Sequence, residues 1–390
     1  MQTYFDNAAT SFPKPSVVCD AILKYQTESG ASPGRGAYVR AKQATALLEK
    51  CRSLLCELVN APSTEHCIFT MNCSDALNLA IVGIANHWLQ LDEPVHIVTT
   101  AMDHNSVLRP IDALDQFGVT HTIVDVDSTT GVVQPRDIAS AITPHTRLVA
   151  VAHGSNVTGT IQDIEMIGHA CGDVPFLVDA AQTMGHTLID VQAMHIDMLA
   201  FPGHKGLLGP LGTGGVILKP GIEQLLSPIR FGGTGSQSDS PSQPDILPDK
   251  YESGSHNMVG IAGLTASVEW ILAQGVETLQ EHEQSLCEQF IEGLQHCSNA
   301  KIVGPPTGNH RCGVFSLTFG ENPHIVSSRL EEMSGIQSRS GLHCAPFAHR
   351  AMGTTKSEGT VRVSFGPFHT SEDISSLVES IKNVTQKVLT

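Results

Sequence analysis

The chain has 390 residues, of which 41% are hydrophobic and 16% charged, and its formal net charge is −16. This length and composition are typical of a globular protein with two unequal domains, and they exclude an extensively disordered chain. The acidic balance and the absence of runs rich in Lys and Arg argue against a surface for nucleic acid or for an anionic membrane.

The first seven residues, Met1–Asn7, lack the basic and then apolar pattern of a signal peptide, and no apolar run approaches the length of a membrane span. The ten cysteines include no Cys-x-x-Cys pair, so zinc-binding and thioredoxin-like sites have no support. We therefore expect a metal-free protein with reduced thiols in a cytoplasmic compartment.

The first 60 residues contain two predicted helices. Ser16–Glu28 is a short helix candidate between turn-rich segments, and the apolar positions of Ala44–Val59 recur at helical spacing.

Short strand-like runs then alternate with helical patterns over about 150 residues. The predicted strands are Cys67–Met71, Val95–Thr100, His121–Val126, Leu148–His153, Phe176–Ala180, Met198–Phe201 and Gly215–Leu218. The predicted helices between them are Asp75–Trp88, Asn105–Phe117, Pro135–Ala141 and Ile161–Cys171. This alternation predicts an α/β fold in which a mostly parallel seven-stranded sheet is flanked by helices.

The remaining pattern predicts a smaller α+β domain. A polar segment, Gly232–His256, precedes predicted helices at Met258–Gln274 and Glu277–Gln295. Strands at Gly313–Phe319, Ile336–Ser340 and Val361–Phe365 and a last helix at Glu372–Val388 complete it. We expect a large domain of residues 15–257 and a small domain made of residues 1–14 and 258–390.

Polar residues follow the predicted strands, where open α/β sheets bind their ligands. They are Asn72-Cys73-Ser74-Asp75 at a helix start, His104, Asn156, Asp179 with Gln182, and His204-Lys205. A helix start suits a phosphate, an acid suits a cationic ring nitrogen, and a desolvated lysine can attack a carbonyl carbon. One ligand, pyridoxal 5′-phosphate (PLP), would account for all of them.

Each feature also has a plain structural explanation. Ser74 suits an ordinary helix cap, Asp179 a cap or an ion pair, and Lys205 a solvated loop. Taken singly, His104 suits a solvated loop position, and Cys344 suits a buried structural site. Only the combination of these residues predicts a PLP site.

That ensemble resembles a known family. The segments Asp6-Asn7-Ala8-Ala9-Thr10, Ser155-Asn156-x-x-Gly159, Asp179-x-x-Gln182 and Gly203-His204-Lys205 resemble the class V aminotransferases of PLP fold type I. Within that family, Arg339-Ser340-Gly341-Leu342-His343-Cys344 resembles the catalytic-cysteine loop of the group II cysteine desulfurases, similar to SufS and CsdA.

The resemblance implies roles for the residues around the cofactor. Lys205 would be the Schiff-base lysine, Asp179 the partner of the ring nitrogen, Gln182 that of the ring hydroxyl, and His104 the cover of the ring face. The residues implied at the phosphate are Cys73, Ser74, His204 and, from the neighbouring subunit of a homodimer, Ser255. Those implied at the substrate are Arg362 as the carboxylate clamp, Asn156 and Ala9.

The resemblance further implies that Cys344 takes sulfur from L-cysteine as a persulfide and leaves L-alanine, with Arg339 and His343 favouring its thiolate. A sulfur-acceptor protein and a place in iron–sulfur cluster assembly would follow. Selenocysteine lyase, another class V lyase or aminotransferase, and a catalytically silent sulfur-assembly scaffold remain open alternatives.

Three positions depart from the family pattern. Pro202 stands where a serine or threonine usually precedes Gly-His-Lys, and Cys73 replaces the first threonine of the usual phosphate pair. The chain also has one residue fewer between Ala345 and Pro346, so the Cys344 loop is expected to differ in shape.

Overall fold

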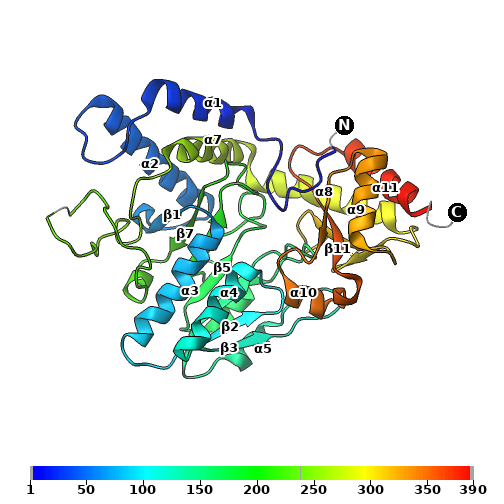
Figure 1. Ribbon diagram of the computed structural model, residues 1–390, viewed down its shortest axis with the longest axis horizontal. Helices are drawn as coiled ribbons and strands as arrows, with labels where there is room; N and C mark the ends of the chain where they lie inside the picture. The colour runs from blue at the N-terminus through cyan, green and yellow to red at the C-terminus, as the bar shows by residue number, and fades with distance from the viewer. Residues whose placement is uncertain (1–2, 238, 387–390) are drawn as a thin grey trace.

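The computed structural model describes residues 3–237 and 239–386. Its larger sheet has seven strands in the order β1-β7-β6-β5-β4-β2-β3 (Figure 1). They are β1 (Cys67–Thr70), β2 (His96–Thr100), β3 (Thr120–Val124), β4 (Thr146–Ala152), β5 (Phe176–Asp179), β6 (Met198–Pro202) and β7 (Gly214–Leu218). Only β7 runs antiparallel to its neighbours, which confirms the mostly parallel sheet.

Helices cover both faces of this sheet. Side chains alternate along β6, so Met198 and Ala200 join one core while Leu199 and Phe201 join the other. The first core is completed by α3 (Cys73–Leu89) and α4 (Asn105–Leu114). The helices on the second are α2 (Val39–Leu58), α5 (Pro135–Ala141), α6 (Ile164–Cys171) and α7 (Met258–Gln274). The first helix, α1 (Ser16–Lys24), packs on α7.

A second, antiparallel sheet has the strand order β10-β11-β9-β8. Its strands are β8 (Lys301–Val303), β9 (Val314–Thr318), β10 (Arg339–Gly341) and β11 (Thr360–Ser364). The associated helices are α8 (Val276–Leu294), α9 (Pro323–Ser334), α10 (Pro346–Ala351) and α11 (Ser371–Gln386). The N-terminal segment joins this part through bridges of Tyr4 to Gln337 and of Asp6 to Ser364, and Phe5 enters its core.

The helix boundaries show where local patterns were insufficient. The helix α2 begins at Val39, before the predicted Ala44, and α3 begins at Cys73 and not at Asp75. The helices α9 and α10 were not predicted, because few of their residues are buried and the apolar spacing is weak. The last predicted helix extended to Val388, and residues 387–388 lie outside the described part of the chain.

The division into residues 15–257 and residues 1–14 with 258–390 stays a prediction. The helix α7 packs in the core of the larger sheet, whereas α8 packs against α11, and this packing favours a boundary near Gly275.

No single described helix is long and apolar enough to cross a membrane. The pair α7 and α8, bent by 79° at Gly275, meets the length and composition requirement only when the two are taken together.

Candidate active site

Lys205 lies in a pocket of about 580 Å³ at the carboxyl edge of the larger sheet. The strands β2, β4, β5 and β6 end here, because parallel strands bring their carboxyl ends to one edge. Eight of the predicted site residues line this pocket: Cys73, Ser74, His104, Asn156, Asp179, Gln182, His204 and Lys205. Residues that are far apart in the sequence therefore lie together around one pocket.

Asp179 is the last residue of β5, and the residue is 5% exposed. Its Oδ1 accepts a hydrogen bond from the Ala181 N–H at 2.9 Å and one from the Cys73 thiol at 3.5 Å. No hydrogen bond to Oδ2 occurs within the described residues, so this oxygen is available to a ligand. Burial, and after it the Asp179 charge, raise the pKa of Cys73 well above its usual range, so Cys73 is a neutral thiol.

Lys205 is half-buried, and burial lowers the pKa of its amine. Asp179 and Cys73 oppose this shift, while the Arg362 charge reinforces it. A lysine with a depressed pKa has a larger neutral fraction, which is the nucleophilic form.

His104 caps the N-terminus of α4. Its Nδ1 accepts a hydrogen bond from the Ser106 N–H at 3.0 Å, so the ring proton of the neutral histidine resides on Nε2. Burial lowers the pKa of His104 to about 4, with Asp179 opposing and Lys205 reinforcing the shift. His104 is therefore a neutral ring with a fixed tautomer at the pocket wall.

The start of α3 supplies backbone donors to the same pocket. Asn72 is the helix cap, since its Oδ1 accepts the Asp75 N–H at 3.0 Å, and Ser74 does not have the capping role that the sequence left open. The N–H groups of Cys73 and Ser74 have no partner within the helix. The Ser74 hydroxyl lies 2.6 Å from that of Ser106, a further pocket residue that was not predicted.

The N-terminal segment holds the loop that carries Lys205. The His204 carbonyl oxygen accepts hydrogen bonds from the Ser11 N–H at 3.0 Å and from the Lys14 ammonium at 2.9 Å. Burial lowers the pKa of Lys14 to about 8, and burial followed by the charges of Lys205 and Lys14 lowers that of His204 to about 4. The buried His204 Nδ1 has no partner among the described residues.

Arg362, on β11, reaches this region from the smaller sheet. Its side chain is 4% exposed, Nη1 donates to the Asn156 carbonyl at 3.1 Å, and Nη2 donates to Asp6 Oδ1 at 2.9 Å. Burial lowers the pKa of Arg362, with Asp6 opposing this effect. The contact with Asp6 was not anticipated, because 356 residues separate the pair.

Cys344 follows β10 in a loop whose backbone is constrained. His343 and Cys344 have φ values of 48° and 58°, in the left-handed region that non-glycine residues seldom occupy. The Asn156 side chain donates to the His343 carbonyl at 2.6 Å, and the Cys344 carbonyl accepts the Asn105 N–H at 2.8 Å. Both contacts tie the loop to residues beside the pocket, and Cys344 itself is exposed.

The expectation that His343 favours the Cys344 thiolate is wrong. The His343 ring is buried, and burial followed by the Arg362 charge lowers its pKa to about 2, so it carries no positive charge near neutral pH. The cations on the adjacent strands β10 and β11 are Arg339 and Arg362, and both form ion pairs with Asp6.

Four predicted site residues do not line the Lys205 pocket: Cys344 and Arg362, described above, and Ser255 and Ala9. Ser255 lines a separate pocket with Thr70, Arg230 and Glu252, so its expected contact with a neighbouring subunit's phosphate stays a prediction. Ala9 lines neither pocket that contains Lys205, although the carbonyl of the preceding Ala8 accepts a hydrogen bond from Gln182 at 3.1 Å.

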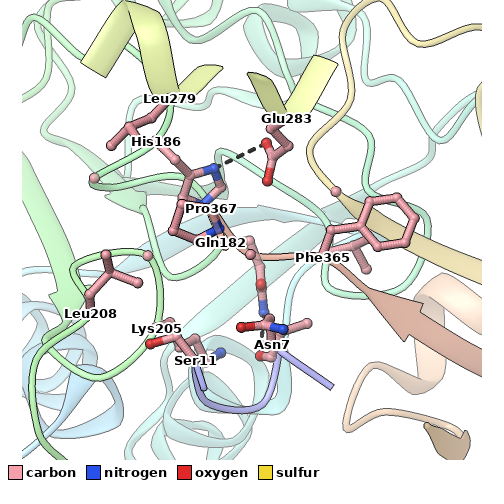
Figure 2. A pocket seen from close by; sticks show the side chains of 16 residues that line it. Asn7, Ser11, Gln182, His186, Lys205, Leu208, Leu279, Glu283, Phe365 and Pro367 are labelled. Carbon is pink, nitrogen blue, oxygen red and sulfur yellow. Dashed lines mark hydrogen bonds and ion pairs between the residues drawn. The ribbon is translucent and has the colours of Figure 1, made fainter. Parts of the chain in front are cut away.

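A second pocket, of about 550 Å³, lies on the other side of Gln182 and Lys205. Figure 2 shows His186 and Glu283 facing one another at its upper wall, with Asn7 and Ser11 below. The His186 Nδ1 lies 3.1 Å from Glu283 Oε2. This pair connects α8 with the loop that packs against Gly206, beside Lys205.

Comparisons with known proteins match the whole chain. The family model for aminotransferase class-V matches residues 3–377. The chain belongs to the class-V aminotransferase family. A probable cysteine desulfurase from Methanothermobacter thermautotrophicus is 36% identical over 387 residues, covering 98% of this chain and 94% of that protein. A cysteine desulfurase from Yersinia pseudotuberculosis is 32% identical over 390 residues, covering 98% and 93%.

Solved structures of cysteine desulfurases have the same fold. The apo cysteine desulfurase from Thermococcus onnurineus NA1 superimposes with a TM-score of 0.90 at 31% identity, covering 98% of this chain and 94% of that one. The cysteine desulfurase CsdA from Escherichia coli gives 0.85 at 26% identity, covering 99% and 95%. The predicted fold class and family resemblance are thus confirmed.

Proposed function

We propose that this protein is a PLP-dependent cysteine desulfurase that converts L-cysteine to L-alanine and collects the sulfur on Cys344. The observation that carries the proposal is the placement of Lys205, Asp179 and His104 around one pocket, to which Asn156 ties both Arg362 and the Cys344 loop. The similarity to cysteine desulfurases along the full chain supports it.

The residues of the pocket fit PLP. Asp179 offers an unpaired carboxylate oxygen to a cationic ring nitrogen, and the α3 start offers the N–H groups of Cys73 and Ser74 to a phosphate. The unpartnered, buried His204 Nδ1 adds a group at the same pocket. The hydroxyl that Pro202 removes is matched by nearby Ser74 and Ser106, whose oxygens lie 2.6 Å apart. PLP would supply the electron sink that lets bonds to the substrate Cα and Cβ break.

The chain's own residues would bind and orient the substrate. The Arg362 guanidinium, fixed by Asn156 and Asp6, would bind the carboxylate. The Lys205 amine, whose pKa is lowered, would take and return the proton at Cα. His104 would cover the ring face and present its Nε2–H toward the pocket, because the Ser106 N–H occupies Nδ1.

Sulfur transfer would use the exposed Cys344. Its thiolate attacks the substrate sulfur, and a new S–S bond forms as the Cβ–S bond breaks. The electron pair of the broken bond stays with Cβ, which takes up a proton. The products are L-alanine and a Cys344 persulfide, and no added oxidant is needed because the Cβ–S electron pair stays on Cβ.

Several finer properties belong to this proposal. We propose a homodimer in which Ser255 completes the neighbouring phosphate site, a protein acceptor that removes sulfur from Cys344 for cluster assembly, a cytoplasmic location, and an Ala9 contact to the substrate. The two-domain division would place Cys344 and Lys205 on different domains.

The test is to supply the PLP-loaded protein with L-cysteine and a reductant and to quantify alanine and sulfide. We expect both from the wild type and at most a few per cent from Cys344→Ala. Equal output from the two would refute the role of Cys344, and transamination products would favour a class-V aminotransferase. A wild type without products would favour the silent scaffold, and faster turnover of L-selenocysteine that survives in Cys344→Ala would favour a selenocysteine lyase.

Borohydride trapping tests the cofactor anchor independently of turnover. Mass spectrometry should find PLP fixed to the peptide that contains Lys205 in the wild type and no fixed PLP in Lys205→Ala. PLP fixed to Lys14, the nearby lysine with a lowered pKa, would refute the assignment.

A further inference from the structure

Asp6 forms ion pairs with two arginines of the smaller sheet. Its Oδ1 accepts from Arg362 Nη2 at 2.9 Å, and its Oδ2 accepts from Arg339 at 2.8 Å from Nη2 and 3.1 Å from Nε. Arg339 and Arg362 are cross-strand partners on β10 and β11, so their guanidinium groups lie on one face. The Asp6 carboxylate therefore pairs with both guanidinium groups.

The N-terminal segment holds this carboxylate in place. Asp6 forms a bridge to Ser364 at the end of β11, and the Ser364 N–H donates to the Phe5 carbonyl at 2.7 Å. The Tyr4 hydroxyl donates to the Thr10 carbonyl at 2.9 Å, which closes the turn that contains Asp6. The Asp6 side chain is only 14% exposed, so the ion pairs are partly shielded from solvent.

The net charge of the cluster formed by Asp6, Arg339 and Arg362 is +1, because two guanidinium groups face one carboxylate. Arg362 is buried beside Asn156, where the substrate carboxylate would bind, whereas Arg339 is half-exposed on β10, the strand that leads into the Cys344 loop. The carboxylate of an amino acid would neutralise the remaining charge. A second anionic group on the substrate Cβ would lie beside Cys344. The positive charge available to it would be that of Arg339, which is already paired with the Asp6 carboxylate.

We propose that Asp6 determines substrate specificity. It pairs with Arg339 and so selects amino acids with an uncharged sulfur group, such as L-cysteine, over those with an anionic group on Cβ, such as L-cysteine sulfinate. This inference rests on the proposed function, because that function places the substrate sulfur at Cys344.

The disfavoured reaction is chemically accessible in the same pocket. In L-cysteine sulfinate the Cβ–S bond breaks with its electron pair remaining on Cβ, which takes up a proton to give alanine. Sulfur dioxide leaves and adds water to give sulfite, so Cys344 need not act as an acceptor. Asp6 therefore disfavours L-cysteine sulfinate by weakening the binding of its sulfinate group, not by preventing the bond cleavage.

The local charge can be measured without turnover. Iodoacetate and iodoacetamide alkylate the same thiolate, but only iodoacetate is an anion, so the ratio of their rates reports the potential at Cys344. We expect Asp6→Asn to raise this ratio about two- to ten-fold, the range for one unit charge at roughly 6–10 Å in a medium of effective dielectric constant about 40–80. Mass spectrometry of the Cys344 peptide gives the rates, and the exposed Cys19 serves as the internal reference.

Three further variants separate charge from structural damage. Arg339→Gln should lower the ratio, and Asp6→Asn/Arg339→Gln should return it to within two-fold of the wild type, because the two charge changes cancel. Glu321→Gln is the matched control, since Glu321 pairs with Arg329 at 2.8 Å on another surface of the same part of the chain, and it should leave the ratio unchanged. A double variant that stays as far from the wild type as Asp6→Asn would overturn the proposal.

The second measurement uses both substrates with the PLP-loaded protein. The ratio of kcat/KM for L-cysteine sulfinate to that for L-cysteine, followed by alanine release, should rise about two- to ten-fold in Asp6→Asn. An unchanged ratio in an active variant would overturn the specificity role. If the wild type releases no alanine from either substrate, the proposed function fails and so does the role in specificity, while the alkylation ratios still decide whether Asp6 sets the charge at Cys344.

Discussion

Replacing Arg52 by methionine should destabilise the protein strongly. The Arg52 side chain is 1% exposed and pairs with Glu252, 3% exposed, through contacts of 2.8 and 2.5 Å. Burial works against charge on both groups. Nevertheless, Glu252 raises the pKa of Arg52 above its ordinary value, and hydrogen bonds from His256 and Arg52 hold the pKa of Glu252 below its own. The pair is therefore charged in the folded state, and removing one partner leaves an uncompensated buried charge.

The expected loss follows from what remains around Glu252. Breaking a buried ion pair from one side costs about 3–5 kcal/mol. Glu252 would keep the Phe69 N–H and His256, both at 2.6 Å, so the lower end of that range, about 3 kcal/mol, applies. The double variant Arg52→Met/Glu252→Gln should recover at least half of the loss, because no buried charge is left.

Urea unfolding at pH 7, followed by circular dichroism and tryptophan fluorescence, gives the free energies of unfolding. A loss below about 1 kcal/mol in Arg52→Met, or a double variant as unstable as the single one, would refute the reasoning. Because Glu252 lies three residues before Ser255, Arg52→Met should also weaken PLP retention, which gel filtration followed by absorbance measures.

Two further predictions concern buried histidines and Gly206, next to Lys205. Burial lowers the pKa of His153 and of His349 to about 4 from the ordinary 6.5, so the unfolded chain binds more protons between these values and stability should fall as pH drops from 6.5 toward 4. The slope should approach about 1.4 kcal/mol per pH unit for each histidine, and it should be smaller in His349→Gln; equal urea midpoints at pH 7 and pH 5 would contradict this. In Gly206→Ala the new Cβ would lie 2.4 Å from the His186 ring and 2.5 Å from the Met184 carbonyl, so the Lys205 loop should shift and PLP affinity should fall at least ten-fold. The control Gly233→Ala meets nothing within 4 Å and should bind PLP as the wild type does.

Much of the larger sheet could be predicted from short apolar runs. The β1–β7 strands lie within two residues of their predicted bounds, and α5 and α7 match theirs, because buried apolar strands and helices leave a local pattern. The eight residues that gather at the Lys205 pocket could also be listed, since each follows a strand and parallel strands share one edge.

Local patterns could not find the contacts made across the chain. Asp6 meets Arg339 and Arg362 from more than 330 residues away, and no spacing within the sequence encodes that pairing. The same holds for Lys14, which contacts the His204 carbonyl across 190 residues. These contacts depend on the N-terminal segment lying beside both β11 and the loop that carries Lys205.

The sequence by itself determined the α/β class, the order of the strands along the chain and the set of polar residues at their ends, because all of these are properties of neighbouring residues. The tertiary structure decided the ionisation and direction of those groups. Burial makes His343 neutral, and the α4 N-terminus fixes the His104 tautomer. Solvent exclusion and long-range charge, which no local pattern records, are the physical reason for the difference.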